Sequence, residues 1–203
     1  MSRRLVVALV AATVGLAGPA VGQTTGMPSF NAPYRAFADQ EFGATLSFPE
    51  TDGLAIEGQY RFGARTWDIG FRGGILDPDG PADTRILLGA EFRNRVITHT
   101  RDFPLDGAVV LGIGAQLVED FSRVIIPGGL SLGRRLDVED SDVSIVPYAQ
   151  PTLFLTTGNN QDTELNFALG FGADFRLSSA FDARLSFGLG DIEGIAISAV
   201  WVR

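Results

Sequence analysis

The sequence predicts an all-β fold, a closed antiparallel up-and-down β-barrel of about ten strands. Three observations favour this fold. After residue 40 the chain is divided at short intervals by turn-forming clusters, the segments between them alternate apolar and polar residues, and no window carries a convincing helical period. A length of 203 residues suits one domain with an interior. Eight strands are the alternative if the regions around Thr98 and Pro147 are not paired.

The N-terminus has the pattern of a signal peptide. Arg3 and Arg4 precede an apolar stretch over residues 5–17, and small residues follow at 20–22. The apolar stretch is shorter than the roughly 20 residues that a membrane-spanning helix needs, which disfavours the alternative of a retained anchor. We therefore expect residues 1–22 to be cleaved near Gly22. The absence of Cys excludes a lipoprotein anchor and disulfides.

Two further parts are expected after the signal peptide. Residues 23–39 are polar, with Gly26, Pro28 and Pro33, and are interpreted as a flexible leader in the periplasm. Residues 40–203 form the predicted barrel domain, in which nine turns separate ten strands. These turns are expected at residues 49–53, 63–65, 77–83, 98–107, 119–122, 137–142, 157–162, 178–180 and 190–194.

Four predicted strands show the alternation most clearly: residues 54–62, 67–75, 164–176 and 181–189. Because successive side chains of a strand point to opposite sides, each of them has one apolar and one polar face. The segment 143–156 fits least well. Pro147 and Pro151 each remove a ladder donor, so a bulge or an irregular stretch is expected there.

Alternation alone does not say which face points outward. The polar face is rich in small residues, as a narrow lumen requires, and the basic residues are all Arg, whereas a soluble barrel's outer face would normally include Lys. Ten tilted residues rise roughly 25 Å, the height of the apolar band of a membrane barrel. These features predict a transmembrane barrel. The alternative is a soluble, lipocalin-like barrel, periplasmic or secreted, with Phe71, Phe167 and Phe187 inside as a pocket for an apolar ligand.

Aromatic residues near strand ends, on the apolar faces, are interpreted as girdles at the membrane interfaces. They are Phe62, Trp67, Phe175, Phe181 and Trp201.

In these features residues 40–203 resemble the small outer-membrane β-barrel proteins of Gram-negative bacteria. The resemblance rests on pattern, without a signature motif. It implies an outer-membrane location and contact with membrane lipid and with the barrel-assembly machinery. Members usually end in an aromatic residue, whereas here the alternating segment that contains Trp201 ends in Arg203.

The polar faces carry charges of both signs that are expected in the lumen, where they would form ion pairs across the interior. Such a network would either fill and stiffen the barrel or line a narrow channel; small barrels are largely filled by side chains, which favours the first. The predicted set is Glu57, Arg61, Asp68, Arg72, Arg85, Glu91, Asp174, Arg176, Asp182 and Arg184.

No residues form a convincing catalytic or metal-binding pattern, so we expect an interaction or structural protein, or a narrow channel, without enzymatic activity, metal or cofactor. The lone His99 lies in a connection away from any Ser or acid on a shared strand face. Asp77, Asp79 and Asp83 lack a complete calcium pattern. A net charge of −8 argues against nucleic acid as a partner.

Overall fold

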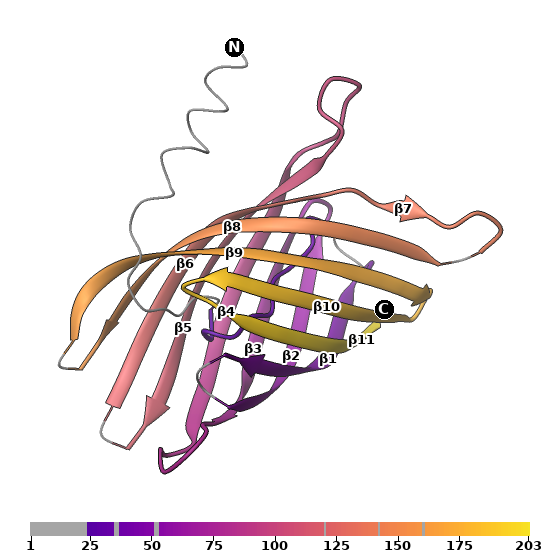
Figure 1. The fold of residues 1–203 in the computed structure, drawn as a ribbon. Coiled ribbons are helices and arrows are strands. Elements are labelled where there is room, and N and C mark those ends of the chain that lie inside the picture. Colours follow the sequence, from indigo (N-terminus) through magenta and orange to yellow (C-terminus); the bar gives the residue numbers. More distant parts are fainter. Residues whose placement is uncertain (1–23, 35–36, 51–52, 120, 142, 160) are drawn as a thin grey trace.

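The computed structural model describes residues 24–34, 37–50, 53–119, 121–141, 143–159 and 161–203. The predicted signal peptide lies outside the described residues. The described chain winds into a barrel of tilted antiparallel strands (Figure 1). The strands are β1 (Gln40–Pro49), β2 (Leu54–Ala64), β3 (Trp67–Asp77), β4 (Arg85–Ile97), β5 (Asp106–Val118), β6 (Phe121–Gly133), β7 (Leu136–Asp137), β8 (Ser144–Gly158), β9 (Gln161–Ser178), β10 (Phe181–Gly190) and β11 (Gly194–Val202).

Ten of these strands close the barrel. Each pairs with its neighbours in sequence, β6 pairs with β8, and β1 pairs with β11. The two-residue strand β7 is an extra element that pairs only with the start of β8 among the described residues. The prediction of a ten-stranded up-and-down barrel is confirmed. The alternative of eight strands is wrong, because the strands on both sides of residue 98 and the strand that contains Pro147 are all paired.

The segment of β8 that contains the two prolines is regular toward β9 and interrupted toward β6, so the expected irregular stretch is present on one side, without a bulge. Pro147 pairs with Ala173 and Pro151 with Leu169 in one unbroken register, and the register shift between β8 and β9 lies at Thr156–Gly158 instead. Both prolines have side chains on the outer face, between buried neighbours such as Tyr148. Toward β6, the pairing stops at Thr152, resumes at Ala149 and ends at Tyr148, because a proline has no N–H to donate to the ladder.

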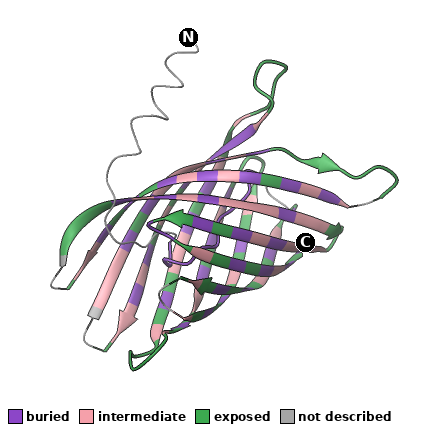
Figure 2. Cartoon of the chain, viewed as in Figure 1, coloured by how far each residue is buried: buried purple, intermediate pink, exposed green. Residues whose placement is uncertain are grey.

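Burial alternates along the strands (Figure 2). The inward-facing residues are mostly polar, charged or small, whereas the outward-facing ones are large and apolar. In β2, for example, Ala55, Glu57 and Arg61 are buried, and Ile56, Tyr60 and Phe62 are exposed. The barrel therefore presents its apolar faces to its surroundings and its polar faces to its own interior.

The strand ends form two rims. We call the end at which β1 begins and β11 ends the C-terminal rim; among the described residues it carries 65–66, 98–105, 134–141, 143 and 179–180. The opposite rim carries the described residues 50, 53, 78–84, 119, 159 and 191–193. The two longest connections, one of which includes β7, both lie at the C-terminal rim.

Over residues 24–34 the structure differs from the flexible leader that was expected at residues 23–39. Residues 24–33 are buried, and Tyr34 is half-buried, because this segment runs inside the barrel. We call residues 24–34 the lumen segment. Among the described residues, no helix is both long and apolar enough to cross a membrane.

Candidate functional site: a charged lumen occupied by the N-terminal segment

The structure gathers the predicted lumen residues on the inner face of the barrel. Eight of them are buried: Glu57, Arg61, Asp68, Arg72, Glu91, Asp174, Asp182 and Arg184. The other two, Arg85 and Arg176, are half-buried. They come from β2, β3, β4, β9 and β10. Successive side chains of a strand point to opposite sides, and these residues occupy the inward-facing positions.

Arg61 lies among three carboxylates. Its Nη1 donates to Asp68 Oδ1, its Nη2 donates to Glu91 Oε1 at 2.5 Å, and its Nε lies 3.7 Å from Glu41 Oε1. Arg93 binds the second oxygen of Asp68, with its Nε and Nη2 both 3.0 Å from Oδ2. All five side chains are nearly or completely buried, so each charge is compensated by direct contact with opposite charges.

A second group surrounds Arg184. Its guanidinium donates to both oxygens of Glu41, at 2.9 and 2.7 Å, and lies 3.6 Å from both Asp174 and Asp182. Arg176 reaches Asp182 at 3.2 Å. Glu41 contacts both Arg61 and Arg184, so the two groups form one network from β4 around to β9.

Sequence reasoning missed two members of this network. Glu41 and Arg93 are both buried, and both continue polar rows that were visible: Glu41 precedes Gly43, Thr45 and Ser47 at intervals of two, and Arg93 follows Glu91. The period of two could have identified them. The alternation could not show that Glu41 joins the two halves of the network, because that depends on the register between β1 and its neighbours.

The lumen segment is bound by side chains of the barrel wall. The Asn31 side-chain amide donates to both oxygens of Glu91, at 2.9 and 3.1 Å, and the Asn31 backbone N–H donates to Gln150 Oε1 at 3.1 Å. The Ser131 hydroxyl donates to the Asn31 carbonyl at 2.5 Å. One residue of the segment is therefore held by three strands, β4, β6 and β8.

Other wall side chains satisfy the backbone carbonyls of the segment. This matters because a chain without its own ladder would otherwise bury unpaired carbonyl groups. The donors are Gln116 to Thr25 at 2.9 Å, Ser186 to Pro28 at 2.6 Å, Tyr148 to Phe30 at 2.8 Å and Arg93 to Ala32 at 2.6 Å. Arg72 also donates to the Ser29 hydroxyl at 2.5 Å.

Glycines of the wall give the lumen segment its space. A Cβ at Gly114 would lie 1.6 Å from the Thr24 carbonyl oxygen, and a Cβ at Gly170 would lie 2.2 Å from the Phe30 ring. Any larger residue at these positions is incompatible with the segment in its observed place. Phe30 also packs with Tyr148, Phe154 and Ile192 in an apolar cluster inside the lumen.

The predicted girdle aromatics all lie toward the C-terminal rim. Trp201 stacks on Phe42 with ring centroids 5.8 Å apart and meets the edge of Phe181 at 5.4 Å. Trp67 stacks on Phe92 at 6.5 Å. Phe62 is exposed and Phe175 half-buried, both on outward-facing positions. The five residues therefore form part of a band at one rim, with Phe42 and Phe92 as members that the prediction omitted.

His99 has an acidic neighbour that the sequence did not reveal. Its Nδ1 lies 2.7 Å from Asp106 Oδ2, and its backbone N–H donates to Asp106 Oδ1 at 3.2 Å. The Tyr34 hydroxyl donates to the same carboxylate; burial and this bond raise the pKa of Tyr34. His99 shares no strand with Asp106, so the strand pattern gave no indication of this contact. These bonds link the end of the lumen segment to the 98–105 connection.

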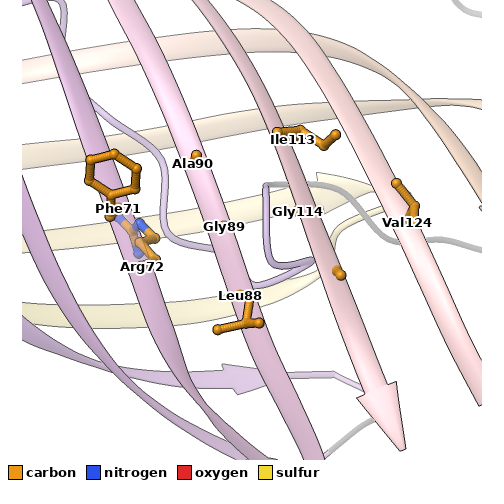
Figure 3. A pocket seen from close by; sticks show the side chains of 9 residues that line it. Phe71, Arg72, Leu88, Gly89, Ala90, Ile113, Gly114 and Val124 are labelled. Carbon is orange, nitrogen blue, oxygen red and sulfur yellow. The ribbon is translucent and has the colours of Figure 1, made fainter.

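Among the described residues, no group of three or more His, Asp or Glu side chains is placed to hold a metal ion. Outside the lumen, a shallow hollow of about 520 Å³ lies over β3 to β6 on the outer face (Figure 3). Its lining is mostly apolar, with Phe71, Leu88, Ile113 and Val124 around smaller residues, and Arg72 also borders it. It belongs to the apolar outer surface.

Comparison with protein-family models gives no match, and comparison with curated proteins gives none either.

Proposed function

We propose that this protein is an outer-membrane β-barrel of structural or interaction type, whose lumen is closed by its own N-terminal segment. The observation that carries the location is the apolar outer surface. Large side chains such as Phe48, Ile86 and Ile197 are about half-exposed around the barrel. Exposing such a continuous apolar surface to water is costly, whereas acyl chains would cover it without loss.

The interior supports the same location. The buried ion pairs and hydrogen bonds of the lumen replace the polar contacts that a water-facing surface would make. A soluble barrel that binds an apolar ligand would need the reverse arrangement. Phe71 and Phe187, expected inside in that alternative, are 48% and 39% exposed on the outer face. The charged lumen around Arg61 and Arg184 is poorly suited to an apolar ligand.

The closed lumen is the reason for favouring a structural or interaction role over a channel. The lumen segment extends through the interior from Tyr34, on the side of the C-terminal rim, to Thr24 beside Gly114, and Phe37, which follows the segment, packs against Val200 and Val202. We propose no catalytic step for the His99–Asp106 pair, since a nucleophile would also be needed. Membrane lipid, and the assembly machinery during insertion, are the partners that this role requires.

Membrane fractionation of the expressed full chain tests the location. We expect recovery in the outer membrane and faster gel migration of the unboiled sample, because a closed barrel resists detergent unfolding without heat. Recovery as a soluble periplasmic protein that needs no detergent would overturn the proposal.

Conductance in planar bilayers tests the closed lumen. The chain from residue 23 onward should show no steady conductance, whereas deletion of residues 24–34 should open a polar path and produce channels. A deletion variant that still shows the heat-dependent gel shift but conducts no better than the intact chain would contradict the role of the segment in closing the lumen.

A further inference from the structure

A polar cavity of about 260 Å³ opens at the C-terminal rim, where the lumen segment enters the barrel. One water occupies about 30 Å³, so the cavity has room for a small solute. The lumen segment contributes Pro33 and Tyr34 to one wall, and Phe37, which follows the segment, lines the same side. The barrel contributes the other through the lining residues Arg65, Thr66, Asp68, Arg95 and Arg135.

Three arginines line this cavity from three different connections or strand ends. Arg65 lies in the β2–β3 turn, Arg95 lies near the end of β4, and Arg135 lies between β6 and β7. The backbone holds the first two together, since the Arg95 N–H donates to the Thr66 carbonyl at 2.9 Å. The Arg135 guanidinium lies over the Tyr34 ring, 5.1 Å from its centroid, and the Arg135 N–H donates to the Tyr34 hydroxyl at 3.4 Å.

Asp68 supplies the carboxylate of the lining, but it does not neutralise the charge of the three arginines. Asp68 is already bound by Arg61 through one oxygen and by Arg93 through the other. No ion pair involving Arg65, Arg95 or Arg135 is found among the described residues, whereas the buried arginines Arg61, Arg93 and Arg184 all have carboxylate partners. The cavity is therefore a positively charged site in a protein of net charge −8.

The backbone at Arg65 decides which substitution can test its charge. Its φ is +54°, in the left-handed region where Gly or Asn is the usual residue. Asn at this position would therefore keep the turn while removing the guanidinium group.

We propose that this cavity binds a phosphate-bearing anion. The guanidinium group matches the oxygens of a phosphate with paired N–H donors and keeps its charge at all ordinary pH values. Phosphate could come from a soluble ester that enters the mouth of the barrel or from a lipid headgroup beside the rim. The anion-binding chemistry is the same in both cases, and it does not depend on the membrane location proposed above.

Isothermal titration calorimetry on the chain from residue 23 onward, refolded in a phosphate-free detergent, tests the proposal. The soluble probes are inorganic phosphate and glycerol phosphate. The lipid probe is the protein reconstituted in nanodiscs of phosphatidylglycerol, and nanodiscs of the zwitterionic phosphatidylcholine are the control. Binding of the free anions identifies a soluble source. If phosphatidylglycerol, but not phosphatidylcholine, prevents the free anions from binding or stabilises the protein, the source is a lipid headgroup. Either result supports the site, and a response to none of the probes overturns it.

A matched pair of variants separates a site from general charge. Arg65→Asn combined with Arg95→Gln keeps the left-handed turn and removes two guanidinium groups, and it should weaken anion binding at least about tenfold. Two substitutions at exposed arginines outside the cavity lining on the same rim, Arg101→Gln and Arg134→Gln, remove the same charge and should change binding less than about twofold. Equal losses in both double variants would overturn the proposal. The heat-dependent gel shift verifies folding in each case and tests the barrel independently.

Discussion

The carbonyl oxygen of Thr24 occupies the place where a side chain at Gly114 would begin, 1.6 Å from the position of a Cβ. Gly114→Val should therefore displace the start of the lumen segment, and because a Cβ there would also lie 2.8 Å from the Leu88 carbonyl oxygen, the heat-dependent gel shift is needed to verify that the barrel still closes. The expected result is measurable conductance in planar bilayers. Gly58→Val is the matched control, since a Cβ there meets nothing closer than 3.8 Å. Conductance from both variants, or from neither, would contradict the assignment.

Asn31 is expected to dominate the binding of the segment to the wall. Asn31→Ala removes two hydrogen bonds to the buried carboxylate of Glu91 and should weaken docking by about 1 to 3 kcal/mol. Asn31→Asp should weaken it further, because it places a second carboxylate against Glu91. Hydrogen–deuterium exchange of residues 24–34 measures the effect, with exchange rising about tenfold for each 1.4 kcal/mol. Unchanged exchange in the Asp variant would argue against the observed contact.

Arg61 should contribute more to barrel stability than an arginine on a rim. Arg61→Met leaves Asp68 and Glu91 without their closest shared cation and should lower the free energy of unfolding by about 3 to 5 kcal/mol. Arg101→Gln, at an exposed position, should change it by less than about 0.5 kcal/mol. Urea unfolding in lipid vesicles, followed by tryptophan fluorescence, compares the two. Similar stabilities for both variants would show that the network is dispensable.

Glu50 and Glu193, at the rim opposite the C-terminal rim, make part of the free energy of unfolding depend on pH. The hydrogen bond with the Glu193 side chain and the negative charge of Glu193 raise the pKa of Glu50. The folded state therefore binds this proton more tightly than the unfolded state, so the contribution to stability is present below the ordinary carboxyl range and is lost as the pH rises through the raised pKa.

Glu50→Gln should remove this dependence. Relative to the unmodified protein, the variant should gain stability as the pH rises from about 4 to about 7. Unfolding midpoints across that range measure the gain. Glu119→Gln, an exposed glutamate on another turn of the same rim, is the control. A parallel pH profile for Glu50→Gln and the unmodified protein would contradict the predicted coupling.

The position of the two tryptophans gives a direct measure of depth in the membrane. Trp67 and Trp201 are the two tryptophans of the sequence, and both lie at the C-terminal rim with exposed rings. In bilayers with brominated acyl chains we expect quenching to be strongest when bromine lies close to the headgroups and weakest when it lies at the bilayer centre. No quenching at any depth would indicate that this rim stands clear of the membrane.

Much of the architecture was determined by the sequence alone. Turn clusters and the period of two predicted the ten strands and the composition of both faces, because these are local properties of an extended chain. Ile56 and Glu57, for example, lie on opposite faces because they are adjacent residues of one strand. The same local pattern indicated an irregular stretch at Pro147, and the ladder toward β6 ends beside it, whereas the unbroken ladder toward β9 was not predictable from the proline itself.

The place of the lumen segment was decided only by the tertiary structure. Residues 24–34 carry no strand period because their polar groups bind wall side chains such as Gln116, Tyr148 and Arg93 instead of a ladder. The partners of the charges are non-local in the same way. Glu41 meets Arg184 across 143 positions of sequence because the first and last strands close on one another. Closure, register and lumen width set these contacts, and none of them is a property of a single segment.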